Sequence, residues 1–262
     1  MCYIAGGAYA EYTAAPALHA FKVPDGLSDE VAAAAYMQGL AATTLVCEAF
    51  EAVPGRWALV HAAAGGVGLW LCQLLRLQGV NVVATASTEE KRQIAKVHGG
   101  ADLVLGYGDD DLVKRIREVT GGGGVDIVFD GVGKATLDSS LAVLRRAGTL
   151  VMHGTASGEP ESFKVGLLTP KNIKLLKPTF MNYLVTRGEV EQYARRVFEA
   201  ITTDSVSVYV SGVYSLADIQ KAHAVSIRNA VPLYGRLLTG TGSGMPPDRR
   251  QGTREAVGRV RE

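Results

Sequence analysis

A glycine-rich hexapeptide is the part of this sequence whose residue types and spacing indicate chemistry most directly. Residues 63–68 read Ala-Ala-Gly-Gly-Val-Gly, after a short apolar run at 57–61 and before a segment with helical spacing at 67–78. Such glycines let the backbone approach a pyrophosphate and let the helix pack closely on the strand. The helix N-terminus then offers free N–H groups and a positive dipole end to the phosphates. We therefore predict a dinucleotide site, with Ala63 in the place of the first glycine.

The end of the next expected strand, 80–86, carries no acidic residue. Enzymes that use NAD commonly place Asp or Glu about 20 residues past the glycines to bind the ribose hydroxyls, whereas this chain has Thr85 there. A carboxylate would repel a 2′-phosphate, and Ser87 with Lys91 could bind one, so the pattern favours NADPH over NADH. A structural interpretation stays open beside it: Ser87 and Glu90 have the spacing of a capping box, which would leave Lys91 as a solvated charge.

No side chain has the surroundings of a catalytic acid, base or nucleophile. The five histidines share no short ligand spacing with each other or with a cysteine, so we predict no metal site. His61 and His153 end expected strands, and we interpret them as packing or cofactor-edge residues. Asp130 is either functional or a solvated strand end, and Tyr107 either lies near an adenine or only packs. Hydride transfer requires chiefly proximity and orientation, so an unidentified catalytic residue does not exclude it.

Strand-like and helix-like segments alternate between residues 56 and 152. Strands alternating with helices form βαβ units, which predicts an α/β fold with a doubly wound parallel Rossmann sheet. A tight strand–helix turn alone could require the glycines of 63–68, but their place in the first βαβ unit favours the dinucleotide. The expected strands are 57–61, 80–86, 103–105, 125–130 and 149–152, and the expected helices are 67–78, 89–97, 110–119 and 134–146.

The segments on either side of this series are each too short to bury a core alone. We expect them to meet in space as one smaller, mainly β, second domain. Their expected elements are strands at 9–13, 207–214 and 234–238, a long helix at 28–50, a helix at 189–201 and a helix between the last two strands. The final stretch is rich in Gly, Pro and Arg, which predicts disorder.

The composition excludes several classes of protein. With 262 residues and a net charge of +1, the chain has no electrostatic reason to bind nucleic acid or an anionic membrane. The longest apolar run, 31–42, is too short to span a bilayer and reads as a buried helix. Cys2, Cys47 and Cys72 have no paired spacing, and no secretory signal is visible, which favours a reducing, cytoplasmic setting.

Several separate motifs agree, in order and spacing, with one known family. The chain resembles the zinc-free quinone oxidoreductases of the medium-chain dehydrogenase/reductase superfamily, the zeta-crystallin-like branch. The resemblance covers about residues 5–238. The motifs that carry it are 61–68, 86–91, 129–133 and 154–158, with 7–12 and 170–173 in support.

This resemblance implies hydride transfer from NADPH to a quinone in a homodimeric enzyme. It places the glycine-rich turn on the pyrophosphate, through Ala64, Gly65, Gly66, Val67 and Gly68, and it places Ser87, Lys91 and Tyr107 around the 2′-phosphate. Two turns would border the nicotinamide half, one with Gly131 and Val132 and one with Gly154, Thr155 and Ala156. Arg236 would lie close to the cofactor.

The resemblance also implies a domain organisation. We expect a remnant of a GroES-like catalytic domain with an interdomain helix at 1–45, the Rossmann domain at 46–183, the C-terminal part of the catalytic domain at 184–239 and a disordered tail at 240–262. Family members carry roughly 80 further residues before the first motif, within a two-domain enzyme of ordinary size. Ala41 stands where the family usually has Thr.

Two other functions remain open. An enoyl or alkenal reductase of the same superfamily would use the same cofactor site. A catalytically silent NADPH-binding fragment, with or without a role in binding RNA, would keep the cofactor site alone, although the near-neutral charge disfavours nucleic acid.

Overall fold

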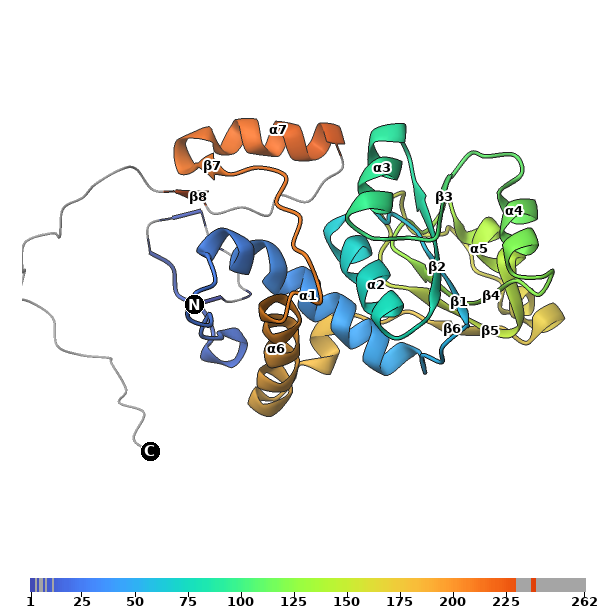
Figure 1. The fold of residues 1–262 in the computed structure, drawn as a ribbon, viewed down its shortest axis with the longest axis horizontal. Coiled ribbons are helices and arrows are strands. Elements are labelled where there is room, and N and C mark those ends of the chain that lie inside the picture. The colour runs from blue at the N-terminus through green and yellow to red at the C-terminus, as the bar shows by residue number, and fades with distance from the viewer. Residues whose placement is uncertain (3, 5–6, 8, 11, 230–236, 239–262) are drawn as a thin grey trace, which may run out of the picture.

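The centre of the molecule is a parallel sheet of six strands in the order β3-β2-β1-β4-β5-β6 (Figure 1). The structure is a computed structural model that describes residues 1–2, 4, 7, 9–10, 12–229 and 237–238. The order puts β1 between β2 and β4, which is the switch point where a doubly wound sheet opens a crevice at its carboxyl edge. The strands are β1 (Trp57–Val60), β2 (Asn81–Ala86), β3 (Leu103–Gly106), β4 (Val125–Asp130), β5 (Leu144–Met152) and β6 (Lys174–Leu176).

Helices cover both faces of this sheet, because strand side chains alternate between two cores. Val60 and Phe129 pack on the side of α1, α2 and α3, while Leu59 and Val128 pack on the side of α4 and α5. The predicted doubly wound α/β fold is therefore confirmed. The covering helices are α2 (Gly66–Leu77), α3 (Glu89–Val97), α4 (Leu112–Val119) and α5 (Leu137–Val143). The strand β6 is an addition that the alternating pattern did not predict.

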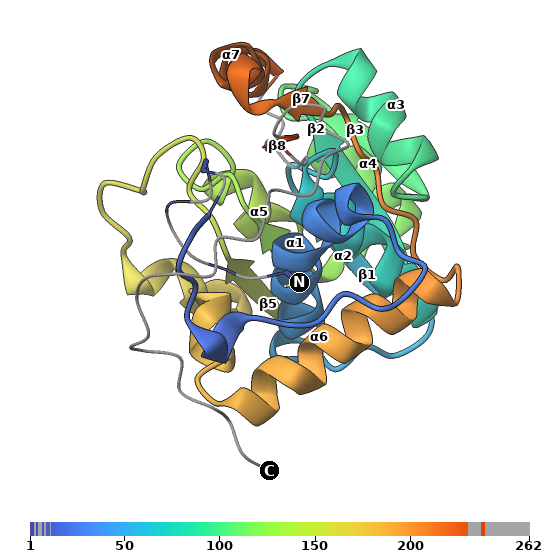
Figure 2. The same ribbon diagram turned by 90° about the vertical axis from the view of Figure 1, so that its left-hand side faces the viewer.

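The long helix α1 (Asp29–Ala49) joins the first flank to the sheet. Ser28 caps it by accepting a hydrogen bond from the backbone N–H of Val31. The helix packs against both α2 and α6 (Arg187–Thr202), as the two views in Figures 1 and 2 show. A Cβ at Gly39 would lie 2.6 Å from a methyl carbon of Val197, so only glycine permits this approach of α1 to α6. The predicted buried helix is confirmed.

Little β structure is present in the described parts of the flanks. Cys2 and Phe21 form an isolated bridge, and β7 (Tyr214–Ser215) pairs with β8 (Leu237–Leu238). Residues 207–213 form no strand, because Ser207 bonds a side chain of α2 instead: its N–H donates to Gln73 Oε1 at 2.8 Å. The strand expected at 9–13 is therefore wrong for the described residues, and the strand expected at 207–214 is wrong except for Tyr214, which begins β7. The helix α7 (Ile219–Asn229) is confirmed. The expected tail at 240–262 lies outside the described residues.

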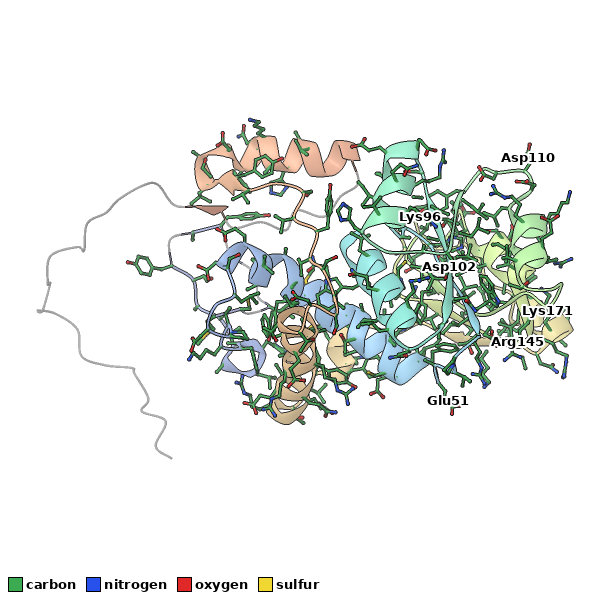
Figure 3. All side chains as sticks on the ribbon, viewed as in Figure 1. Glu51, Lys96, Asp102, Asp110, Arg145 and Lys171 are labelled. Atoms are coloured by element: carbon green, nitrogen blue, oxygen red, sulfur yellow. The ribbon has the colours of Figure 1, made fainter. Side chains whose placement is uncertain are left out.

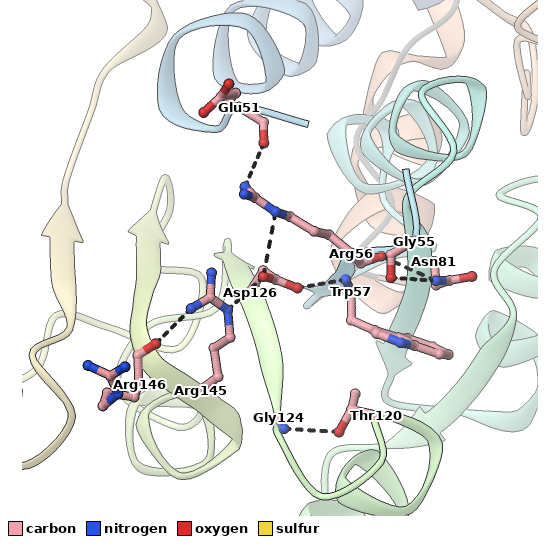
Figure 4. Close-up of polar contacts among 10 residues, drawn as sticks. All are labelled: Glu51, Gly55, Arg56, Trp57, Asn81, Thr120, Gly124, Asp126, Arg145 and Arg146. Carbon is pink, nitrogen blue, oxygen red and sulfur yellow. Dashed lines mark hydrogen bonds and ion pairs between the residues drawn. The ribbon is translucent and has the colours of Figure 1, made fainter. Parts of the chain in front are cut away.

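Carboxylates hold the amino edge of the sheet. Asp126, near the start of β4, accepts a hydrogen bond from the N–H of Trp57 at 2.9 Å and one from Arg145 Nε at 2.6 Å (Figure 4). It also forms an ion pair with Arg56 at 3.8 Å. One carboxylate therefore joins β1, β4 and β5 at their starts, on the edge opposite to the crevice.

Two charged side chains that Figure 3 labels satisfy backbone groups nearby. Asp102 accepts a hydrogen bond from the N–H of Val82 at 2.8 Å and pairs with Arg76. Lys171 donates to three carbonyl groups between Leu141 and Leu144, at the end of α5. Within the part of the chain that is described, no helix is both long enough and apolar enough to cross a membrane.

Candidate functional site

The glycine-rich turn follows β1 at the switch point and leads directly into α2. Its backbone leaves no room for a side chain at Gly68, because a Cβ there would lie 2.4 Å from the carbonyl oxygen of Ala62 and 2.7 Å from Cα of Ala63. Gly65 is the N-cap residue of α2 and donates its N–H to the carbonyl of Ala62 at 2.9 Å. Ala62 itself has φ +53°, a left-handed conformation that costs a non-glycine residue roughly 1–2 kcal/mol. The structure thus holds the turn in one tight geometry.

A cavity of about 250 Å³ opens beside this turn, at the carboxyl ends of β1, β2 and β4. It brings together predicted site residues that are far apart in the sequence. Its walls are formed by Ala62, Ala64, Gly65, Ala86, Ser87, Lys91, Tyr107, Val132, Ala156 and Ser157.

The polar rim of the cavity is formed where β2 meets α3. Thr88, not Ser87, is the N-cap of α3, and its hydroxyl accepts a hydrogen bond from the N–H of Lys91 at 3.2 Å. The predicted capping box is therefore wrong by one residue, because the helix begins one residue later than the pattern suggests. The hydroxyl of Ser87 accepts instead from the ammonium group of Lys91 at 3.5 Å. Ser87 is exposed and Lys91 is half-buried, and together they can bind an anion.

Tyr107 contacts the glycine-rich turn through its hydroxyl group. The hydroxyl oxygen accepts a hydrogen bond from the N–H of Ala62 at 2.9 Å. Burial raises the pKa of this phenol, so it stays protonated at neutral pH. The ring lines the cavity while the oxygen supports the turn, which is a more specific role than the plain packing left open by the sequence.

Asp130 ends β4 and is fully buried. Its Oδ1 accepts hydrogen bonds from the N–H groups of Val132 at 2.8 Å and Gly133 at 2.9 Å, and both oxygens accept from Thr136 Oγ1. The interpretation of Asp130 as a solvated strand end is therefore wrong. The turn that it stabilises carries Val132 into the wall of the cavity.

A second cavity, of about 280 Å³, lies between α1 and the end of β5. Its walls are mostly apolar. His153 contributes to them, and its Nε2 is buried without a hydrogen-bond partner in the protein. Burial lowers the pKa of His153 to about 4 against the opposing effect of Asp130, so the ring is neutral at pH 7. The lining residues are Met37, Ala41, Leu45, Val67, His153, Pro178, Thr179 and Phe180.

Glycines bring the ends of β4 and β5 close together between the two cavities. A Cβ at Gly154 would lie 2.8 Å from the carbonyl oxygen of Gly131, and a Cβ at Gly131 would lie 2.9 Å from Cε1 of His153. Thr155 lies at the same junction, where its Cα would be 3.1 Å from a Cβ at Gly133. The predicted residues Gly131, Gly154 and Thr155 are thus adjacent in space, while Arg236 lies outside the described residues.

Sequence reasoning named His61 but missed the polar residues that it contacts underneath the site. His61 Nδ1 lies 2.6 Å from Thr85 Oγ1, and His61 Nε2 lies 3.1 Å from Ser140 Oγ. All three side chains are buried. The available signal was a set of polar residues at positions where a buried strand or helix face ordinarily carries apolar ones.

The chain has clear relatives among known proteins. Residues 66–200 match the family model of zinc-binding dehydrogenases. A probable quinone oxidoreductase from Schizosaccharomyces pombe is 40% identical over 83% of this chain and 65% of its own length. The chain belongs to the zinc-binding dehydrogenase family. It spans about two thirds of the length of the relatives that it matches.

Two further relatives show the range of the likeness. The structure of Escherichia coli quinone oxidoreductase complexed with NADPH has a TM-score of 0.80 and 35% identity, over 85% of this chain and 69% of that chain. A 2-haloacrylate reductase from Burkholderia is 34% identical, over 83% of this chain and 66% of its own length. Despite the name of the family, the described residues contain no group of three or more His, Cys, Asp or Glu side chains that could hold a metal ion.

Proposed function

We propose that this protein is an oxidoreductase that transfers a hydride from NADPH to a quinone, without zinc. The glycine-rich turn, the acid-free end of β2 and the Ser87–Lys91 pair all lie around one cavity, and this observation carries the proposal. The NADPH in the E. coli relative supports the same cofactor.

The residues present fit a dinucleotide. The tight turn at Gly68 leaves the backbone of residues 64–67, Ala64, Gly65, Gly66 and Val67, free to approach a pyrophosphate at the N-terminus of α2. Ser87 and Lys91 would bind the 2′-phosphate, with the ring of Tyr107 beside the adenosine. The turns that carry Gly131 and Gly154, with Val132, Thr155 and Ala156, would border the nicotinamide half.

Bound NADPH would supply the hydride, and the chain would supply position and exclusion of water. The second cavity suits a flat apolar acceptor, because Met37, Leu45 and Phe180 line it and no charged side chain does. The unpartnered Nε2 of neutral His153 is available for one hydrogen bond to an acceptor molecule. Ala41 brings no hydroxyl to this wall. A hydride brings two electrons and one hydrogen to the quinone, and one further proton, which water can supply, completes the hydroquinone.

The first experiment is a titration of the purified chain with NADPH and, separately, with NADH, followed by the fluorescence of Trp57 and Trp70. Saturable binding with a preference of at least tenfold for NADPH is the expected result. NADPH oxidation that depends on added quinone is then expected in a stopped assay. A folded sample that binds neither nucleotide would overturn the proposal.

Reduction of an activated C=C bond is a second candidate, favoured by the likeness to the 2-haloacrylate reductase. The same cofactor cavity would serve both reactions, so binding of NADPH does not separate them. Comparison of α,β-unsaturated carbonyl compounds with quinones as acceptors does. A higher kcat/KM for the unsaturated carbonyl compounds would favour this second candidate.

We further propose that the protein acts as a homodimer in the cytoplasm. In the described part of the sheet β6 is an edge strand, and edge strands offer unpaired backbone groups to a partner. Leu175, on this strand, is partly exposed. Sedimentation equilibrium tests the proposal, because a single species of about twice 27.7 kDa is expected, and a species of 27.7 kDa at all concentrations would contradict it.

A further inference from the structure

Four polar side chains, Thr85, His61, Ser140 and Asp130, form a chain of hydrogen bonds beneath the cavity, and the ring of Tyr107 packs against it. Thr85 lies in β2 and contacts His61, which follows β1. Tyr107 follows β3, and its ring lies against that of His61 with the two centroids 6.0 Å apart. His61 then contacts Ser140, and Ser140 Oγ donates to Asp130 Oδ2 at 2.9 Å.

The hydrogens in this chain can point in only one direction. Four donors surround the carboxylate of Asp130, which as a carboxylate only accepts. Because Ser140 gives its hydrogen to Asp130, the Ser140 oxygen must accept from Nε2–H of His61. Burial lowers the pKa of His61 to about 4, so the ring is neutral and its Nδ1 must accept.

The remaining links follow from the same reasoning. The hydroxyl of Thr85 donates to Nδ1 of His61, 2.6 Å away. The oxygen of Tyr107, whose ring lies against that of His61, accepts from the N–H of Ala62. Every donor from Thr85 to Ser140 therefore has an acceptor.

The two ends of this chain hold the two walls of the cavity. At one end Tyr107 holds Ala62, whose left-handed conformation sets the glycine-rich turn. At the other end Asp130 holds the N–H groups of Val132 and Gly133, and Val132 lies in the opposite wall. A substitution at either end is therefore expected to alter the hydrogen bonds along the whole chain.

We propose that Asp130 is a positioning residue for the nucleotide cavity. It acts by holding His61 as its Nε2–H tautomer, and it thereby fixes the glycine-rich turn and the turn at Val132 relative to each other. The inference rests on the proposed function and deepens it. Asp130 touches neither cavity as a lining residue, so its effect passes through Val132 on one side and through Ser140, His61, Thr85 and Tyr107 on the other.

The test uses Asp130→Asn, with Asp126→Asn as its matched control. Both aspartates lie on β4. Asp126 lies away from the cavity and accepts a hydrogen bond from Trp57, at the start of β1. In Asp130→Asn the amide N–H₂ would donate to Ser140, which must then donate to His61 Nε2. His61 is therefore expected to change from the Nε2–H to the Nδ1–H tautomer, and ¹⁵N NMR of histidine-labelled protein reads this directly.

In the wild type and in Asp126→Asn, the Nε2–H tautomer is expected. NADPH binding is expected to weaken at least tenfold in Asp130→Asn and less than twofold in Asp126→Asn. A wild-type His61 that is protonated on Nδ1 alone, or on both nitrogens at pH 7, overturns the proposal. Equal weakening in both aspartate variants also overturns it, because a merely structural role would produce that result.

A second pair of variants covers the case in which Asp130→Asn does not fold. Thr85→Val removes the donor to His61, while Thr85→Ser keeps it. Thr85→Val is expected to shift the amide resonance of Val132, on the far side of the cavity, and Thr85→Ser to restore it. This readout needs no nucleotide, so it separates the two ideas: a wild type that binds no NADPH ends the proposed function alone, and an unmoved Val132 ends the positioning role alone.

Discussion

The ammonium group of Lys91 lies 3.5 Å from the hydroxyl of Ser87, in the first turn of α3 and at the rim of the cavity. Because this pair would bind the 2′-phosphate, Lys91→Ala is expected to raise the Kd for NADPH about tenfold, which is about 1.4 kcal/mol. The Kd for NADH is expected to change less than twofold. Fluorescence titration measures both.

Lys114→Ala is the matched control for this prediction, because Lys114 is an exposed lysine on α4 that does not line the cavity. A complementary change is Ser87→Asp. The new carboxylate would repel the phosphate and could accept from ribose hydroxyls, so the preference is expected to shift toward NADH. An unchanged ratio of the two Kd values in both Lys91→Ala and Ser87→Asp would contradict the assigned role.

The cap of α3 allows a test of local stability with two adjacent residues. Thr88→Ala removes the side chain that accepts from the N–H of Lys91 and is expected to lower the free energy of unfolding by about 1 kcal/mol. Ser87→Ala removes no cap and is expected to change it by less than about 0.5 kcal/mol. Urea unfolding measures the difference. The reverse ranking would show that Ser87 is the cap after all.

Buried histidines make the stability depend on pH in a defined direction. Burial lowers the pKa of both His61 and His153 to about 4, below the 6.5 of an unperturbed histidine. Between these values the unfolded chain binds protons that the folded chain does not bind. The free energy of unfolding therefore falls as the pH decreases from 6.5 to 4, and it is fully restored above 6.5.

His153→Phe isolates one of these two contributions. The loss of stability between pH 7 and pH 4.5 is expected to be about 2 kcal/mol smaller in this variant than in the wild type. His223→Phe, at an exposed histidine, serves as the control for the substitution itself. Parallel curves for the wild type and His153→Phe would refute the prediction. Urea unfolding at a series of pH values provides the data.

Gly68 tests the geometry of the turn itself. In Gly68→Ala the new Cβ would lie 2.4 Å from a backbone oxygen, which cannot move aside as a flexible side chain could. Strain of this kind typically costs 1–3 kcal/mol, so a loss of about 2–3 kcal/mol in stability and of detectable NADPH binding is expected. Gly188→Ala, where the Cβ meets nothing within 4 Å, is the control. Gly68→Ala with the stability and Kd of the wild type would contradict the assignment.

Short-range patterns in the sequence were sufficient for the sheet and for the residues around the cavity. The alternation of apolar strands and amphipathic helices predicted β1 to β5 and the helices between them, because each pattern depends on neighbours within a few residues. Residues 144–146 are an exception, because they were expected in a helix and form the start of β5. The glycines at 65, 66 and 68 marked the turn for the same local reason. The strand expected at 9–13 and most of the strand expected at 207–214 failed because a strand requires a partner, and Ser207 finds its partner on α2.

The sequence by itself determined the fold class, the place of the glycine-rich turn and the absence of an acid after β2. Only the tertiary structure decided that Thr88 caps α3, that Asp130 is buried, and that His61 links β2 to α5 through Thr85 and Ser140. The reason is physical. Periodicity and turn chemistry act between residues that are close in the chain, whereas burial and hydrogen bonding depend on groups brought together from distant positions, here 24 and 79 residues apart.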